Sequence, residues 1–198
     1  TTALTSDSSG NIYVINANNT VTRITSGGTV SSLALSGLPV SVTADSNGSA
    51  YIGTNSGGVV LRANFTTGNV STFITIPGVT NQVLNVNYVT ASSELIATAN
   101  QGGTNVFRIS SAGSVVASYT GTGAATNNQV TGFDVANGYI YVPTALGVDK
   151  ITVPTTGTGM TTVSLGLASL ATSGQLSSTT NQLYNVNGAL NWNGSQLW

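Results

Sequence analysis

Charged side chains that could do acid, base or ion chemistry are scarce in this sequence. Its 198 residues contain four Lys or Arg, five Asp or Glu, and neither His nor Cys. Without His and Cys the chain lacks the commonest general base and metal ligand, and it has no thiolate nucleophile. Catalysis by paired carboxylates needs two acids close together, yet the five acids are distributed along the whole chain. We therefore expect no enzyme, no metal site and no cofactor.

Three of the acids are predicted to lie in turns. Asp7 and Asp45 open the turns Asp-Ser-Ser-Gly and Asp-Ser-Asn-Gly, each six residues before a Tyr, and Asp134 lies seven residues before another Tyr. An Asp at the first position of a turn caps backbone N–H groups, and a later Gly accepts positive φ. Oxygens of Asp45 and Asn47 could also bind calcium, but the loop lacks the bidentate Glu that closes an EF-hand loop. We favour turn capping.

The basic residues share one position of a repeating pattern, and they are Arg23, Arg62, Arg108 and Lys150. They are 39, 46 and 42 residues apart, and Trp192 follows a further 42 residues on. One interpretation is a ring of positive charge that holds an anionic ligand, such as a sialylated or sulfated sugar. In the other, each long side chain lies over its own sheet and contacts a turn carbonyl or a nearby Asp. We favour the second, because Asp149 adjoins Lys150.

The same period appears in an apolar, aromatic-rich run that recurs five times, at the anchor residues Tyr13, Tyr51, Ile96, Tyr141 and Tyr184. The anchors are 38, 45, 45 and 43 residues apart, a spacing typical of propeller blades. Between anchors, strand-forming runs alternate with turns that contain Gly or Asn. The fold class that follows is all-β, a five-bladed β-propeller of four-stranded antiparallel blades.

We predict a single domain, residues 1–198, with blades at about 1–36, 37–78, 79–122, 123–166 and 167–198. The fifth blade is predicted to begin with a strand at Gly174 to Ser178. Strands such as Ile12 to Ile15 and Val59 to Leu61 lack strict alternation of polar and apolar residues. That pattern predicts that both faces of these strands are buried.

Low charge also bears on partners and location. A formal net charge of −1 argues against nucleic acid as a partner and against a polybasic membrane segment. No apolar stretch approaches the roughly 20 residues of a spanning helix, so we expect no membrane insertion. Neutral polar residues must keep the surface soluble, a composition common outside cells. The chain starts at Thr1, which we interpret as processing or as origin in a longer protein.

Surface features suggest two further kinds of site. Candidate glycosylation sequons start at Asn18, Asn47, Asn64, Asn69 and Asn193. A long turn-like stretch at 119–129 could carry binding or be a tolerated surface loop. Asn127 and Asn128 of that stretch, with Tyr184 and Trp192, are the candidate ligand-binding residues.

Two phrases, Asp7-Ser-Ser-Gly-Asn-Ile-Tyr-Val14 and Val21-Thr-Arg-Ile24, resemble NHL and SMP-30-like β-propeller repeats. With its spacing, this resemblance covers nearly the whole chain. Enzymes among those propellers use a metal held by acidic and Asn ligands at the axis, or a His in lyase members. Because this sequence has no His and no acidic cluster, the resemblance implies the fold alone.

The C-terminal phrase Thr180-Asn-Gln-Leu-Tyr-Asn-Val-Asn-Gly-Ala-Leu-Asn-Trp-Asn-Gly-Ser-Gln-Leu-Trp198 resembles a segment of fibre and appendage proteins of phages and large DNA viruses. There it often forms a hairpin that joins modules of a trimeric fibre. The resemblance implies a virion-surface location and assembly with copies of the chain or with a capsid or fibre protein.

Three functions are open at this stage. The leading hypothesis is a non-enzymatic structural or receptor-facing module of a virion surface, spike or fibre. The alternative is an extracellular carbohydrate-binding or adhesive propeller of cellular origin, with a host-surface glycan as its ligand. The third is an enzyme with a metal at the propeller axis.

Overall fold

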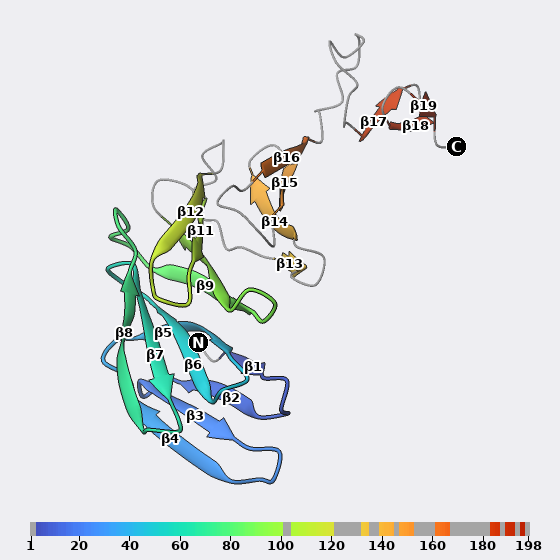
Figure 1. Cartoon of the computed structure of the whole chain (residues 1–198). Coiled ribbons are helices and arrows are strands. Elements are labelled where there is room, and N and C mark those ends of the chain that lie inside the picture. The colour runs from blue at the N-terminus through green and yellow to red at the C-terminus, as the bar shows by residue number, and fades with distance from the viewer. Residues whose placement is uncertain are drawn as a thin grey trace. The chain divides into compact units, whose positions relative to one another are not determined.

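The computed structural model of this chain describes residues 3–100, 104–120, 132–134, 139–144, 147–152, 161–166, 183–186, 189–192 and 195–196. All regular elements among these residues are β-strands, so none of the described part forms a helix that could cross a membrane. The chain separates into two compact units, Thr1–Thr120 and Gly121–Trp198 (Figure 1). The all-β prediction is confirmed.

The first unit holds three antiparallel sheets whose strands pair in chain order. The first sheet contains β1 (Leu4–Ser6), β2 (Ile12–Asn16), β3 (Thr20–Ile24) and β4 (Val30–Ala34). The second contains β5 (Pro39–Ala44), β6 (Ser49–Thr54), β7 (Val59–Asn64) and β8 (Asn69–Thr75). The third contains β9 (Val83–Val89), β10 (Glu94–Asn100), β11 (Thr104–Ile109) and β12 (Val115–Thr120).

The second unit holds two more antiparallel sheets. The fourth sheet contains β13 (Gly132–Asp134), β14 (Tyr139–Thr144), β15 (Gly147–Thr152) and β16 (Thr161–Gly166). The fifth contains β17 (Leu183–Val186), β18 (Ala189–Trp192) and β19 (Ser195–Gln196). The strand predicted at 174–178 lies outside the described residues. The number of blades and the single-domain organisation stay predictions.

Asp134 corrects one of the turn predictions. It is the last residue of β13 and pairs with Tyr139 of β14, so it lies in a strand. Asp7 and Asp45 are in the predicted turns, between β1 and β2 and between β5 and β6. The difference has a sequence reason: Asp134 lacks the Ser-Ser-Gly or Ser-Asn-Gly continuation that makes the other two turns.

Each sheet of the first unit has two distinct faces. We call the face that carries the anchor residue the anchor face, and the opposite one, which carries the residue before the anchor, the receiving face. On the anchor face of the first sheet, Tyr13, Ile15 and Val21 are fully buried. They form one core cluster with the receiving face of the second sheet, which contributes Ala50, Ile52, Leu61 and Ala63.

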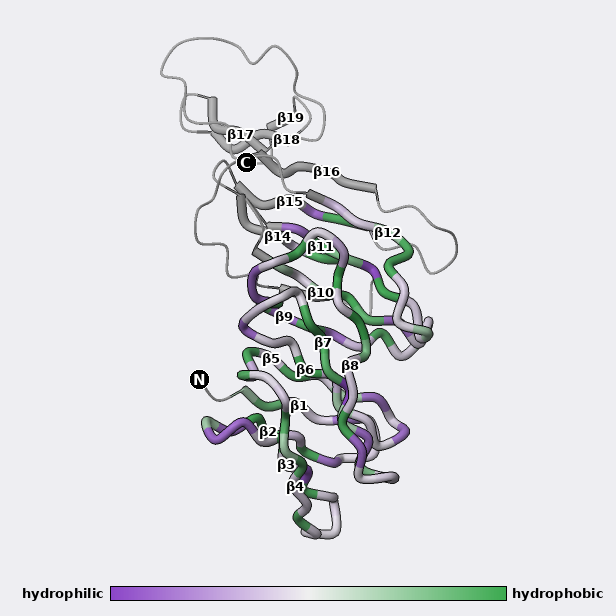
Figure 2. Tube along the Cα trace, turned by 90° about the vertical axis from the view of Figure 1, so that its left-hand side faces the viewer, coloured by the Kyte–Doolittle hydropathy of each residue, from purple (hydrophilic) through white to green (hydrophobic). Residues whose placement is uncertain are grey.

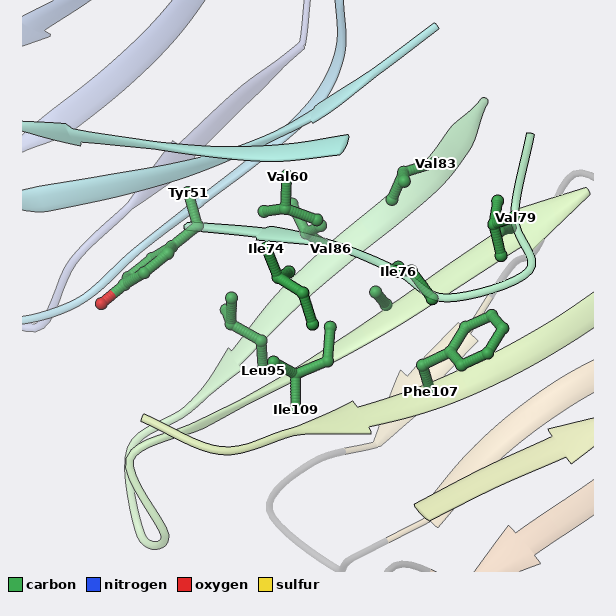
Figure 3. Close-up of a cluster of buried hydrophobic side chains, with 12 residues drawn as sticks. Tyr51, Val60, Ile74, Ile76, Val79, Val83, Val86, Leu95, Phe107 and Ile109 are labelled. Carbon is green, nitrogen blue, oxygen red and sulfur yellow. The ribbon is translucent and has the colours of Figure 1, made fainter. Parts of the chain in front are cut away.

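The second and third sheets repeat this packing. Tyr51, Val60 and Ile74 of the second anchor face cluster with receiving-face residues of the third sheet, among them Val86, Leu95, Phe107 and Ile109 (Figure 3). The first strands of the sheets are neighbours as well, because β5 contacts both β1 and β9. Successive sheets of this unit therefore stack face to face with their first strands adjacent.

Two turn glycines allow another segment of backbone to approach closely. Gly113, in the β11–β12 turn, has φ +78°, and a Cβ atom there would lie 2.5 Å from the backbone oxygen of Phe73 in β8. Gly58 has φ +63°, and a Cβ atom would lie 2.7 Å from the backbone oxygen of Val79. A side chain at either position would meet backbone that has no room to move aside.

The prediction that both faces of Ile12 to Ile15 are buried is wrong for the first sheet. Tyr13 and Ile15 are buried, whereas Ile12 on the other face is 42% exposed and Val14 is half-buried. The other predicted strand, Val59 to Leu61 in β7 of the second sheet, does bury Val60 and Leu61 on opposite faces. Within the first unit, the second sheet has a neighbouring sheet on each face, and no sheet of that unit lies on the receiving face of the first sheet.

We expect Ile52→Ala to destabilise the protein by about 2–5 kcal/mol, because Ile52 is 0% exposed and its removal leaves a cavity between two sheets. Urea unfolding followed by the circular dichroism of the β-sheets measures the change. Leu38→Ala is the control, since Leu38 is 48% exposed and should cost well under about 1 kcal/mol. Equal losses in the two variants would contradict the packing described.

Candidate functional site

The Asp7 turn is held by its own carboxylate. Oδ1 of Asp7 accepts hydrogen bonds from the backbone N–H groups of Ser9, at 2.9 Å, and Asn11, at 3.0 Å. Oδ2 accepts from the Asn11 side-chain amide at 2.8 Å and from the Tyr13 hydroxyl at 3.0 Å. The carboxylate therefore ties the turn to the anchor of its own sheet.

The Asp45 turn repeats this arrangement. Its Oδ1 accepts from the backbone N–H groups of Asn47, at 2.8 Å, and Ser49, at 2.9 Å, and its Oδ2 accepts from the Tyr51 hydroxyl at 3.3 Å. Turn capping by both Asp residues is confirmed. No group of three or more acidic, His or Cys side chains that could hold a metal occurs among the residues that the structure describes.

These contacts set the ionisation of the turn. Burial alone would raise the pKa of Asp7, but hydrogen bonds from Asn11, Tyr13 and Ser9 outweigh it and hold that pKa below the ordinary value of 3.8. Burial, with the neighbouring Asp7, raises the pKa of Tyr13 to about 12, and burial, with Asp45, does the same for Tyr51. The tyrosines are protonated donors to carboxylates, an arrangement that fixes geometry and moves no proton at neutral pH.

The basic residues lie directly opposite the anchors. Strand pairing joins Arg23 to Tyr13, Arg62 to Tyr51, Arg108 to Ile96 and Lys150 to Tyr141. Opposite residues of an antiparallel pair share a face of the sheet. The shared repeat position of the basic residues therefore reflects strand pairing: each of the four pairs with the anchor residue of its own sheet.

Local partners occupy the three arginines of the first unit. The Arg23 guanidinium lies over the Phe65 ring, 5.0 Å from its centroid, and that of Arg62 lies 5.7 Å from the Tyr51 centroid. Nε and Nη2 of Arg62 also donate to the Ser49 hydroxyl, at 3.2 and 3.0 Å. These contacts match the interpretation of local pairing, although the partners are rings and a hydroxyl rather than turn carbonyls or Asp.

Arg108 has the strongest of these contacts. Its Nε lies 2.7 Å from Oε2 of Glu94, and the two side chains are only 4% and 15% exposed. Sequence reasoning missed this pair because Glu94 is out of register with the Asp turns. Glu94 lies two residues before the anchor Ile96, the position held by Ser49 and Asn11 in the other sheets, so its side chain is diagonal to the opposite basic residue.

In the first sheet, the side chain two residues before the anchor does not contact the basic residue opposite the anchor. Asn11 occupies the diagonal position, but its side chain is bound to Asp7 and to the backbone N–H of Ser26. Nε of Arg23 is buried without a hydrogen-bond partner. The ring of Phe65 and the side chain of Tyr13 are the partners of the Arg23 guanidinium. An anionic ligand held by the basic residues stays a prediction.

Other predicted ligand-binding residues lie in the second unit. Tyr184 of β17 pairs with Asn191, and Trp192 pairs with Leu183. Trp192 is thus in the predicted strand but not opposite the fifth anchor, unlike the four basic residues. Asn127 and Asn128 lie outside the described residues. A sugar site formed by these four residues stays a prediction.

Four of the five sequons lie in the described part. Asn18, Asn47 and Asn69 are exposed, whereas Asn64 is half-buried and accepts hydrogen bonds from the backbone N–H groups of Thr66 and Thr67. Asn193 lies outside the described residues. Glycosylation stays a prediction for all five.

Comparison with solved structures places this arrangement in a known class of fold. A hydrazine synthase from Kuenenia stuttgartiensis matches with a TM-score of 0.67 and 15% identity, over 85% of this chain and 55% of its own. A catalytically inactive Staphylococcus aureus virginiamycin B lyase with quinupristin matches with a TM-score of 0.62 and 18% identity, over 94% and 60%. The WD40 β-propeller domain of Doa1 matches with a TM-score of 0.52 and 12% identity, over 76% and 50%.

The protein therefore belongs to the β-propeller fold class. The chain spans 50–60% of the length of these three structures, and at such low identity they establish the fold alone. No protein-family model matches the sequence, and no curated protein matches it either.

We expect Glu94→Gln to destabilise the protein by about 3 kcal/mol, because Arg108 would keep its charge in a nearly buried site without the carboxylate. Arg23→Gln should cost about 1 kcal/mol, because its guanidinium rests on an aromatic ring rather than on a buried ion pair. Urea unfolding at pH 7 measures both. A loss for Arg23→Gln as large as that for Glu94→Gln would contradict this ranking.

We expect alkaline pH to destabilise the protein as the buried Tyr13 and Tyr51 hydroxyls ionise. The pKa of Tyr13 and Tyr51 is about 12 in the folded state against an ordinary 10.0, so the folded state holds more protons in this window and stability falls as pH rises through it. The Tyr13 ring meets the Phe65 ring edge to face, with centroids 5.6 Å apart. Tyr13→Phe keeps this contact and removes one titrating group. Urea midpoints measured between about pH 9 and pH 12 should therefore decline less steeply in Tyr13→Phe than in the unaltered protein, and identical slopes would contradict the assignment.

Proposed function

We propose that this chain is a non-enzymatic propeller module that acts by assembly with other protein surfaces, as a structural or receptor-facing part of a virion surface, spike or fibre. Its partners are copies of itself or a capsid or fibre protein. The observation that carries the proposal is that the charged side chains of the first unit are used within and between its own sheets.

Each of these charged groups has a structural task. Asp7 and Asp45 cap turns and accept from the anchors, Glu94 neutralises Arg108, and Arg62 is bound to Ser49. General acid or base catalysis needs a titrating group within reach of a substrate. Carboxylates that are filled by four and three hydrogen bonds offer little to a ligand.

Enzymes with this fold do not contradict the proposal. The lyase variant that matches this chain is described as inactive, with a histidine replaced by alanine. These 198 residues contain no His, so a reaction that depends on such a residue has no counterpart in them. The neutral polar composition and the C-terminal phrase, which resembles fibre and appendage proteins, support a surface role instead.

Locating the chain tests the proposal. If it is a surface component, quantitative mass spectrometry of purified virus particles should detect it at many copies per particle. Antibodies raised against the chain should label the outside of intact particles in electron micrographs. Its absence from purified particles, with the protein recovered instead as a free species, would overturn the proposal.

A further inference from the structure

Asn47 and Gly48 form an Asn-Gly pair in the turn that joins β5 to β6. In such a pair the Asn side chain can react with the next backbone nitrogen, which Gly leaves unshielded because it has no Cβ. Several hydrophilic stretches of the first unit in Figure 2 lie at turns between strands. The other Asn-Gly pairs of the chain start at Asn137, Asn187 and Asn193 and lie outside the described residues.

The two reacting groups of this pair are unbound in the part of the chain that the structure describes. Asn47 is exposed, and its one hydrogen bond there is made by its backbone N–H. The Gly48 N–H donates to no described acceptor, whereas the Gly10 N–H of the equivalent first-sheet turn donates to the Asp7 carbonyl at 3.2 Å. The side-chain amide of Asn11 is bound as well, to Asp7. Asn47 therefore combines a free amide with a free backbone nitrogen beside it.

We propose that Asn47 is a deamidation site, at which water is the co-reactant. The Gly48 nitrogen gives its proton to a base in the solvent and attacks Cγ of Asn47. The new N–Cγ bond closes a succinimide ring as the Cγ–Nδ2 bond breaks, and ammonia leaves with a proton from the solvent. Water then opens the ring at either carbonyl and leaves aspartate or isoaspartate at position 47. One water is consumed for each ammonia released, and nothing is oxidised or reduced.

The Asp45 carboxylate controls how fast this ring closes. Its Oδ1 accepts from the backbone N–H groups of Asn47, at 2.8 Å, and Ser49, at 2.9 Å. These bonds hold the backbone on both sides of the Gly48 nitrogen, so the Asn47 backbone cannot turn towards its own side chain without straining them. Asp45 is 3% exposed, and a buried carboxylate that loses a donor finds little water to replace it. The folded turn therefore reacts more slowly than the same turn without its cap.

Gly48 has little room for the isoaspartate product. A Cβ atom on Gly48 would lie 3.2 Å from Oγ1 of Thr66 and 3.4 Å from Nη1 of Arg23, and the Gly48 carbonyl accepts from the Phe65 N–H at 2.9 Å. Isoaspartate adds a methylene group to the backbone directly before Gly48, so it disturbs either these contacts or the Asp45 cap. Aspartate leaves the backbone length unchanged and adds a charge to an exposed side chain. Isoaspartate is thus the more destabilising product.

The reaction also bears on the sequon that starts at Asn47. Glycosylation modifies the same side-chain nitrogen, which deamidation removes as ammonia. A chain can therefore carry one of these modifications at this position but not both. Deamidation of this turn does not depend on the proposed function, because it needs water and no partner.

Peptide mapping by mass spectrometry tests the proposal on the 198-residue chain after incubation at mildly alkaline pH. Cleavage after Arg23 and Arg62 separates Asn47 from the other Asn-Gly pairs. The peptide between these cuts should gain about 1 Da at Asn47, and isoaspartyl methyltransferase should label it. Asn47→Gln is the control, because its longer side chain closes a larger ring far more slowly, and that peptide should keep its mass. An Asn47 that stays unchanged while the urea-unfolded chain deamidates there would overturn the inference.

Asp45→Ala tests the role of the cap, and Asp7→Ala is its matched control, because Asp7 holds the equivalent turn of the first sheet. Asp45→Ala should raise the rate at Asn47 at least about fivefold, the effect of losing a hydrogen bond to a charged group. Asp7→Ala should leave that rate within about twofold. If Asp45→Ala does not fold, the urea-unfolded unaltered chain supplies the rate without the cap. Equal rates with and without the cap, or equal acceleration in both variants, would overturn the role given to Asp45.

Discussion

Contact between an anchor face and the next receiving face is the interaction on which the rest of the first unit depends. A sheet of four short strands is marginal by itself, and its stability comes from covering its apolar side chains. Burial of one large aliphatic or aromatic side chain contributes about 1.5–3 kcal/mol, and each of the two clusters contains nine or more buried residues. The sequence therefore repeats once for each sheet, because each sheet must supply one anchor face and one receiving face for this contact.

The polar groups described in this unit support that packing. The anchor tyrosines can be buried because their hydroxyls donate to Asp7 and Asp45, which leaves no unsatisfied polar atom at the end of either ring. The same carboxylates hold the turns that start the anchor strands. Arginines across from the anchors then cover aromatic rings. Asp7 and Asp45, at matching positions, are enough to fix the turn end of the first two sheets.

Features that depend on neighbouring residues could be predicted from the sequence, and features that depend on what packs against them could not. The Asp7 and Asp45 turns carry their own Gly and Ser signals, and the basic residues repeat with the anchors. The Arg108–Glu94 pair is diagonal across two strands, so it requires the register of β10 and β11. Ile12 looks as buried as Leu61 in sequence, but its exposure is decided by whether a sheet lies on it.

That last difference concerns the two faces of each sheet. The three sheets of the first unit carry apolar residues on both faces, so each of them has the composition of a sheet with two neighbours. Within the first unit, the second sheet has both neighbours, whereas no sheet of that unit lies on the face of the first sheet that carries Leu4, Ile12 and Val30. The apolar pattern is therefore the same in the outer and the middle sheet of this unit, and the exposure of Ile12 against the burial of Leu61 follows from the position of each sheet in the stack.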